Sequence, residues 1–174
     1  MKRKLKIQLF SLTICMAFVM MPFYSGAQTS TTNFSGAWVF NAEKSVMGEP
    51  SQGGGQRMGV ANLAVTQDAN LLSVERTRTG QDGQPVTTTS KYTLDGKESI
   101  NTSQRGDSKS VASWSADGKS LTIVTKRTFE RDGQTMEMTS TEVWNLTNTT
   151  TLSIAATMNT PGGERKTTAV YDKK

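Results

Sequence analysis

A repeated Asp-Gly turn signal divides the chain into short segments of alternating apolar and polar residues. The dipeptide occurs at Asp82-Gly83, Asp95-Gly96, Asp117-Gly118 and Asp132-Gly133. Asp-Gly readily adopts the positive φ that tight hairpin turns need. Between the turns, apolar residues recur at every second position, as they do at Leu121 and Ile123. This is the period of a strand with one buried face, and we find no helical stripe.

Short turns make neighbouring strands antiparallel. The sequence therefore predicts an all-β, antiparallel up-and-down meander of about 8–10 strands, which closes into a barrel because closure removes exposed edges. A barrel of this size has an interior wide enough for a small ligand. We expect the barrel domain to span 34–174. A long flexible loop is expected at 41–58, because Gly48, Pro50 and the run Gly53-Gly54-Gly55 interrupt the strand pattern.

The N-terminal residues have the order of a secretory signal peptide. A basic cluster from Lys2 to Lys6 precedes an apolar run from Ile7 to Phe23, and the small residues Ser25-Gly26-Ala27 follow. The run is short for a membrane span and contains Pro22 near its end, which favours a cleaved signal over a permanent anchor. We predict a signal peptide at 1–27 and a disordered, polar leader at 28–33.

Removal of residues 1–27 changes the charge of the protein. Four of the 20 Lys and Arg residues lie in this segment and all 15 Asp and Glu lie after it, which leaves 16 basic against 15 acidic residues and a net charge of +1. This charge gives no footprint of a nucleic-acid binder. We expect an exported protein, periplasmic or secreted and of bacterial type, with no stable membrane anchor after cleavage.

The composition excludes several kinds of catalytic chemistry. The chain has no histidine, and its single cysteine, Cys15, lies in the segment expected to be removed. A Ser-His-Asp triad, a Cys-His pair and a His/Cys zinc site are therefore all excluded from the mature chain. Carboxylate chemistry stays open, but no pair of Asp or Glu stands out. We therefore expect no catalytic residue, metal or cofactor, and we rank binding above enzyme activity.

Two arginines are candidates for binding an anionic group. Strict alternation places Arg76 on the face of Leu72 and Val74, and Arg127 on the face of Leu121. A buried arginine needs an anionic partner, which a ligand carboxylate would supply. The alternative is that both arginines lie near strand ends and reach solvent at the barrel rim. Four further residues would line a cavity or form part of an ordinary core, namely Tyr92, Trp114, Trp144 and Met136.

The first strand carries a family resemblance. The motif Phe34-x-Gly36-x-Trp38, followed by Asn41-Ala42-Glu43-Lys44-Ser45 and a meander, resembles the lipocalin and fatty-acid-binding-protein (calycin) superfamily, and its small exported bacterial domains in particular. The resemblance implies that Gly36 and Trp38 close the barrel base and that the 41–58 loop lies near the opposite mouth. It also implies a late-strand arginine over Trp38, a role that Arg165 could fill. Fatty-acid-binding proteins carry two helices after the first strand, and the Gly-rich loop here shows none.

Together these features predict an exported lipocalin-like protein that binds a small apolar or amphiphilic molecule, with the arginines favouring an anionic one. The alternative is a structural or interaction module of the cell envelope, with a packed barrel and no ligand. The oligomeric state stays open.

Overall fold

The computed structural model describes residues 30–48, 61–80, 82–103, 106–131, 133–160 and 163–174. They form one antiparallel sheet of ten strands in the order β4-β3-β2-β1-β10-β9-β8-β7-β6-β5. The strands are β1 (Gly36–Val46), β2 (Asn62–Gln67), β3 (Leu71–Thr79), β4 (Pro85–Thr93), β5 (Glu98–Ser103), β6 (Gly106–Trp114), β7 (Ser120–Arg131), β8 (Gln134–Asn148), β9 (Thr151–Thr160) and β10 (Gly163–Lys173). This confirms the all-β meander. Within these ranges no helix is long and apolar enough to cross a membrane.

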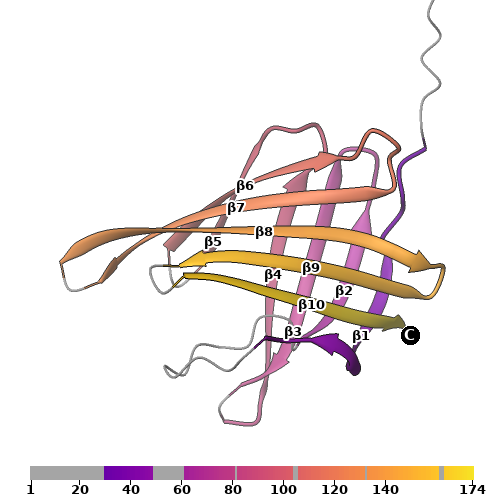
Figure 1. Ribbon diagram of the computed structural model, residues 1–174, viewed down its shortest axis with the longest axis horizontal. Helices are drawn as coiled ribbons and strands as arrows, with labels where there is room; N and C mark the ends of the chain where they lie inside the picture. Colours follow the sequence, from indigo (N-terminus) through magenta and orange to yellow (C-terminus); the bar gives the residue numbers. More distant parts are fainter. Residues whose placement is uncertain (1–29, 49–60, 81, 104–105, 132, 161–162) are drawn as a thin grey trace, which may run out of the picture.

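The sheet wraps into a nearly closed barrel, with β1 pairing β10 across the ends of the chain (Figure 1). β4 and β5 are the two edges of the sheet, and side chains bridge the seam between them. The Asn101 amide accepts the Lys91 N–H at 2.7 Å and donates to the Lys91 carbonyl at 3.0 Å. The Thr93 N–H donates to the Ser99 hydroxyl at 2.8 Å. The Asn101 side chain thus provides Lys91 with the two hydrogen bonds that the backbone of a paired strand would otherwise provide.

The Asp-Gly turns have the backbone conformation expected of them. Gly83, Gly96, Gly118 and Gly133 have φ values of 79°, 77°, 68° and 73°. Gly118 is also constrained by close approach, because a Cβ there would lie 3.3 Å from the Ser30 carbonyl oxygen. Positive φ without a Cβ penalty explains why glycine occupies these turns.

The first strand is longer than expected. β1 continues to Val46, so residues 41–46 of the expected 41–58 loop are strand; residues 49–58 lie outside the described residues. A bulge between Asn41 and Val46 keeps β1 paired with β10. There the Ser45 hydroxyl accepts the Val170 N–H at 2.9 Å and the Asn41 amide donates to Asp172 at 2.6 Å. The sequence pattern of these polar residues predicted a loop, but their side chains bond the bulge of β1 to β10.

The described part of the predicted leader forms hydrogen bonds with the barrel. The Thr32 N–H donates to the Gly118 carbonyl at 2.9 Å. The Thr32 carbonyl accepts the side-chain amide of Gln67 at 2.9 Å. The partner on β2 is distant in sequence, so the local composition of the leader gives no sign of it. The signal-peptide prediction for 1–27 and residues 28–29 lie outside the described residues.

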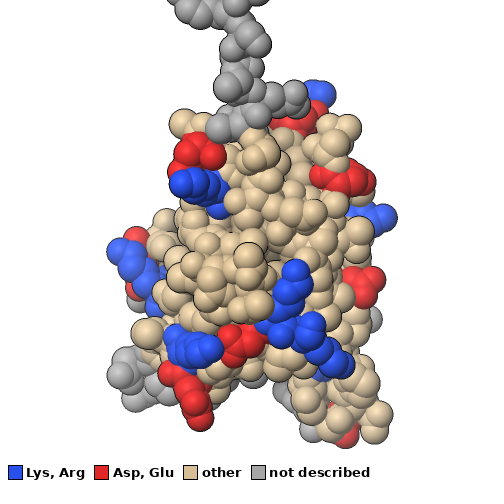
Figure 2. All heavy atoms as spheres, turned by 90° about the vertical axis from the view of Figure 1, so that its right-hand side faces the viewer, with Lys and Arg blue, Asp and Glu red and all other residues tan. Residues whose placement is uncertain are grey.

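The core fills one end of the barrel, which we call the closed half. Its residues are Phe34, Trp38, Leu63, Val65, Leu72, Val74, Tyr92, Ala112, Leu121, Ile123, Trp144, Leu152, Ile154, Ala169 and Tyr171, each at most 6% exposed. Figure 2 looks onto this end, where uncharged side chains form the centre of the surface and charged groups of both signs lie around it. The turns that bear Gly83 and Gly133 lie at the opposite end, which we call the mouth.

Candidate functional site

Trp38, which the resemblance places at the barrel base, is fully buried in the closed half. Its indole is 1% exposed and donates from Nε1 to the Phe34 carbonyl at 2.9 Å. The cation above the ring is Lys173 of β10, whose Nζ lies 5.4 Å from the ring centroid. Arg165 is exposed and pairs in register with Met158, so it does not take this role.

Gly36 makes room for this arrangement. Its φ is 148°, and a Cβ at this position would lie 3.0 Å from the Cε of Lys173 and 3.7 Å from the Nε1 of Trp38. A side chain at Gly36 would therefore displace the lysine from the tryptophan. The closing of the barrel base by Gly36 and Trp38 stays a prediction from the resemblance.

Phe34 completes the base and was not singled out as a core residue from the sequence. It is 0% exposed and precedes β1. Its ring lies parallel to that of Trp114 at 5.8 Å between centroids and edge-on to that of Trp144 at 5.7 Å. The sequence signal that could have indicated its burial is its place in the Phe34-x-Gly36-x-Trp38 motif. Trp114 and Trp144 are thus base residues, and their rings contact Phe34.

A polar layer lies directly above the closed half. Arg76 of β3 and Glu142 of β8 form an ion pair across the barrel, with Nη2 2.9 Å from Oε2 and 3.3 Å from Oε1. The Trp144 indole donates to the same Oε2 at 2.9 Å. The Arg76 guanidinium also lies 6.0 Å from the Trp144 ring centroid. The anionic partner that a buried arginine requires is therefore Glu142.

The surroundings of this layer keep Arg76 charged. Burial lowers the pKa of Arg76, but the Glu142 carboxylate and the Tyr92 hydroxyl raise it by more, so the net pKa is above its usual value. Burial and the Glu142 charge raise the pKa of Tyr171 to about 12, against the opposing effect of Arg76. Tyr92 is a core residue that is 6% exposed and pairs in register with Leu72. The hydroxyl of Tyr92 reaches this layer.

Solvent reaches this layer from inside the barrel. Arg76 alternates with the fully buried Val74, and Glu142 alternates with the fully buried Trp144, so both side chains point inward. Their side chains are nevertheless 25% and 18% exposed. Because both side chains point inward, this exposed area faces the barrel interior, where solvent reaches the ion pair.

We call the inward-facing residues above the core the open half. They include Arg76, Arg78, Val86, Thr88, Arg127, Met138, Ser140, Glu142, Met158 and Arg165. Val86 and Thr88 are exposed although they face inward, as expected where a barrel opens toward its mouth.

Arg127 lies on the wall of the open half. It pairs in register with Ser108 on β6 and Met138 on β8, and it is half-buried. Its Nε is buried without a hydrogen-bond partner. Arg76 and Arg127 thus both face the interior, but only Arg76 has an ion-pair partner among the described residues. Met136 lies nearer the mouth, half-buried and paired with Phe129.

A separate shallow pocket of about 180 Å³ lies on the outer face of β1, β2 and β3. Ala37, Val39 and Ala64 line it, together with the C-terminal Lys174. It contains none of the open-half residues. Within the described ranges, no group of three or more His, Cys, Asp or Glu is placed to hold a metal ion.

Comparison with known proteins supports the fold. No protein-family model and no curated protein matches the chain. Among solved structures, the zebrafish ileal bile acid-binding protein, complexed with cholic acid, matches with a TM-score of 0.52 and 17% identity, over 81% of this chain and 98% of that chain. The likeness and the strand order confirm the predicted lipocalin-like architecture: the chain is a ten-stranded barrel of the calycin fold.

Proposed function

We propose that this chain is an exported protein that binds a small amphiphilic molecule, with a preference for anionic ones, in the open half of its barrel. The observation that carries the proposal is the solvent exposure of Arg76 and Glu142, two side chains that point into the barrel. A packed interior would leave no such exposure. The proposal is one of binding and not of catalysis.

The charge of the open half favours an anionic ligand. It contains four arginines, Arg76, Arg78, Arg127 and Arg165, against one carboxylate, Glu142. Glu142 is paired with Arg76. The buried, unpartnered Nε of Arg127 lacks an acceptor that a carboxylate or sulfonate would supply.

The remaining wall suits the apolar part of an amphiphile. Met138 and Met158 are half-buried and face inward beside Ser140. Methionine adapts to apolar ligands because its side chain is unbranched and flexible. Cholic acid, with which the zebrafish protein is complexed, is likewise an amphiphile.

A titration tests the proposal. Dodecanoate, dodecanol and dodecylamine should be compared by displacement of the fluorescent probe 8-anilinonaphthalene-1-sulfonate. We expect dodecanoate to bind most tightly, and Arg127→Gln to weaken it roughly ten-fold, the scale of a charge-assisted hydrogen bond. Lys126→Gln, one residue along β7 on the outer face, is the matched control and should stay within about two-fold of the unsubstituted protein.

Absence of binding for all three compounds would favour the alternative function, a structural or interaction module of the cell envelope. The tightly packed closed half is compatible with that alternative, and the exposed ion pair speaks against it. Export has its own test, which is the N-terminal residue of protein recovered from its host. We expect Gln28, and a start at Met1 would contradict export by a cleaved signal.

A further inference from the structure

β7 and β8 extend beyond the strands on either side of them. The last β6 partner of β7 is Ser108, which pairs with Arg127, and β9 meets β8 only as far as Thr139, which pairs with Asn159. The described residues 128–131 and 134–138 therefore pair only with one another, and we call them the β7–β8 arm. From Thr139 back to the first residue of β8, Gln134, the arm extends about 17 Å at 3.4 Å per residue. Figure 1 shows this hairpin projecting past β9 and β10 at the mouth.

The two faces of the arm differ in chemistry. Phe129, Met136 and Met138 continue the inward-facing rows of Ile123 and Trp144, and all three are half-buried. Phe129 and Met136 are a cross-strand pair.

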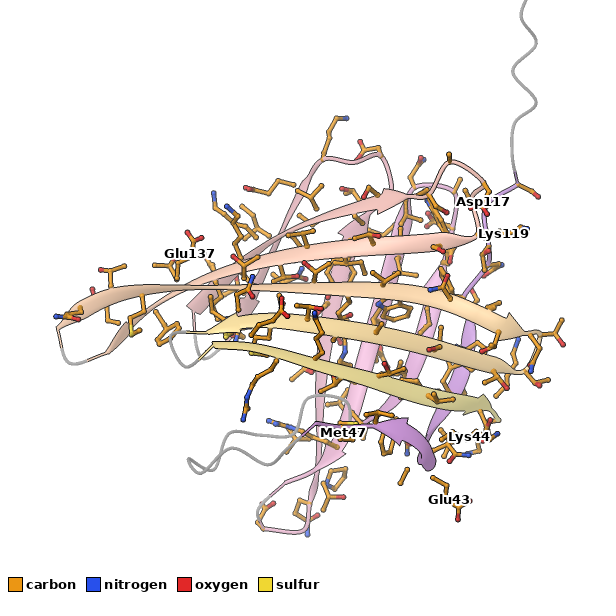
Figure 3. The ribbon with its side chains drawn as sticks, in the orientation of Figure 1. Glu43, Lys44, Met47, Asp117, Lys119 and Glu137 are labelled. Atoms are coloured by element: carbon orange, nitrogen blue, oxygen red, sulfur yellow. The ribbon has the colours of Figure 1, made fainter. Side chains whose placement is uncertain are left out.

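The outer face carries Thr128, Glu130, Thr135 and Glu137, which are all exposed. Figure 3 shows Glu137 on the side of the arm away from β9 and β10. The arm is therefore an amphipathic strand pair whose apolar face continues the inner wall of the barrel.

This apolar face has a specific relation to the proposed ligand site. A two-stranded hairpin is marginally stable alone in water, and an apolar face on it costs free energy when left uncovered. The closed half is filled, so a hydrocarbon chain cannot extend in that direction from Arg127. In register order, Arg127 pairs with Met138 and Phe129 pairs with Met136, so the apolar row leads from the arginine toward the mouth.

We propose that the inner face of the β7–β8 arm binds the hydrocarbon chain of a linear, single-chain amphiphile whose anionic group lies at Arg127. The ligand class is thereby narrowed to long-chain anions, held partly outside the barrel. The chain lies along the strand pair, where Met136 and Met138 adapt to it and Phe129 provides a flat contact. This inference rests on the proposed function.

A chain-length series tests the arm separately from the barrel. Octanoate, decanoate, dodecanoate and tetradecanoate should be titrated against the unsubstituted protein, the inner-face variant Phe129→Ser/Met136→Ser and the outer-face control Thr128→Ser/Thr135→Ser. For the unsubstituted protein we expect affinity to rise up to about four-fold per added methylene, the scale for a fully buried CH₂. The inner-face variant should keep octanoate within about two-fold and lose most of the increment for longer chains, and the control should follow the unsubstituted protein.

An equal loss at every length, or no loss at any length, would overturn the role of the arm while leaving binding in the barrel established. Absence of binding by the unsubstituted protein at every length would overturn both proposals. Hydrogen exchange provides a readout that needs no variant. Tetradecanoate should protect the amides of the β7–β8 arm and octanoate should not, and equal protection by both would contradict the inference.

Discussion

The two halves of the barrel interior are built from the same ten strands but differ in what they bury. In the closed half, Trp38, Leu72, Leu121 and Leu152 are at most 1% exposed. Nearer the mouth, Arg76 of β3 and Glu142 of β8 face inward, and their side chains remain 25% and 18% exposed. The comparison indicates that the closed half stabilises the fold, which leaves the open half free to carry charged side chains.

The largest expected difference between the halves is in stability. Phe34→Ala should lower the free energy of unfolding by about 3–5 kcal/mol, because it removes a fully buried ring and leaves a cavity. Phe129→Ala, on the half-buried arm, should cost less than about 1 kcal/mol, within the range of substitutions away from a packed core. Urea unfolding of both variants measures this, and similar losses would break the distinction between the halves.

The ion pair between the halves should show opposite effects on stability and binding. Glu142→Gln should destabilise the fold by about 1–3 kcal/mol, less than a fully buried pair because solvent reaches both side chains. The same change frees Arg76 and should tighten dodecanoate binding. Glu137→Gln, on the outer face of the same strand, is the control for both measurements. A Glu142→Gln variant that binds dodecanoate more weakly would indicate that Glu142 itself contacts the ligand.

Tyr171 predicts a loss of stability in alkali. Its folded pKa is about 12 against an ordinary 10.0. Because the folded state holds this proton more tightly than the unfolded state, the contribution is complete below pH 10 and is lost as pH rises toward 12. The loss is at most about 2–3 kcal/mol, at 1.36 kcal/mol per pKa unit. Unfolding at pH 9 and pH 11.5 should show a smaller fall for Tyr171→Phe than for the unsubstituted protein, and equal falls would contradict the raised pKa.

The smallest effect is expected at the barrel exterior. The Asn41 amide and the Lys44 ammonium lower the pKa of Asp172, an exposed carboxylate that links β1 to β10. Asp172→Asn should lower the melting temperature only slightly, and the difference should shrink in 1 M salt because exposed ion pairs are screened. Melting curves at low and high salt test this, and a large, salt-independent loss would show that Asp172 has a structural role beyond the ion pair.

The architecture could be predicted because its determinants are local in the sequence. The turns at Gly83, Gly96, Gly118 and Gly133 and the alternation between them follow from backbone geometry over a few residues. The burial of Trp38 belongs to the same strand pattern, since Trp38 and Phe40 lie at alternate positions on one face of the first strand. Lys173 in place of Arg165 could not be predicted, because the choice depends on the register of β10 against β1.

The candidate site was less predictable because its contacts join distant parts of the chain. Strand alternation places Arg76 inward, but nothing near it in the sequence identifies Glu142, 66 residues away, as its partner. The same limit applies to the leader, which is held by Gln67. The β7–β8 arm could not be predicted for a different reason. Alternation predicts a strand, but it does not indicate where the neighbouring strands end.

The side-chain seam between β4 and β5 has a mechanical consequence. Backbone ladders join the strands from β4 round to β5, and the ring is completed by the side chains of Asn101, Ser99 and Thr93. The circumference of the barrel is therefore not closed by backbone hydrogen bonds between β4 and β5. Opening the barrel at this seam would break these side-chain contacts and no backbone ladder.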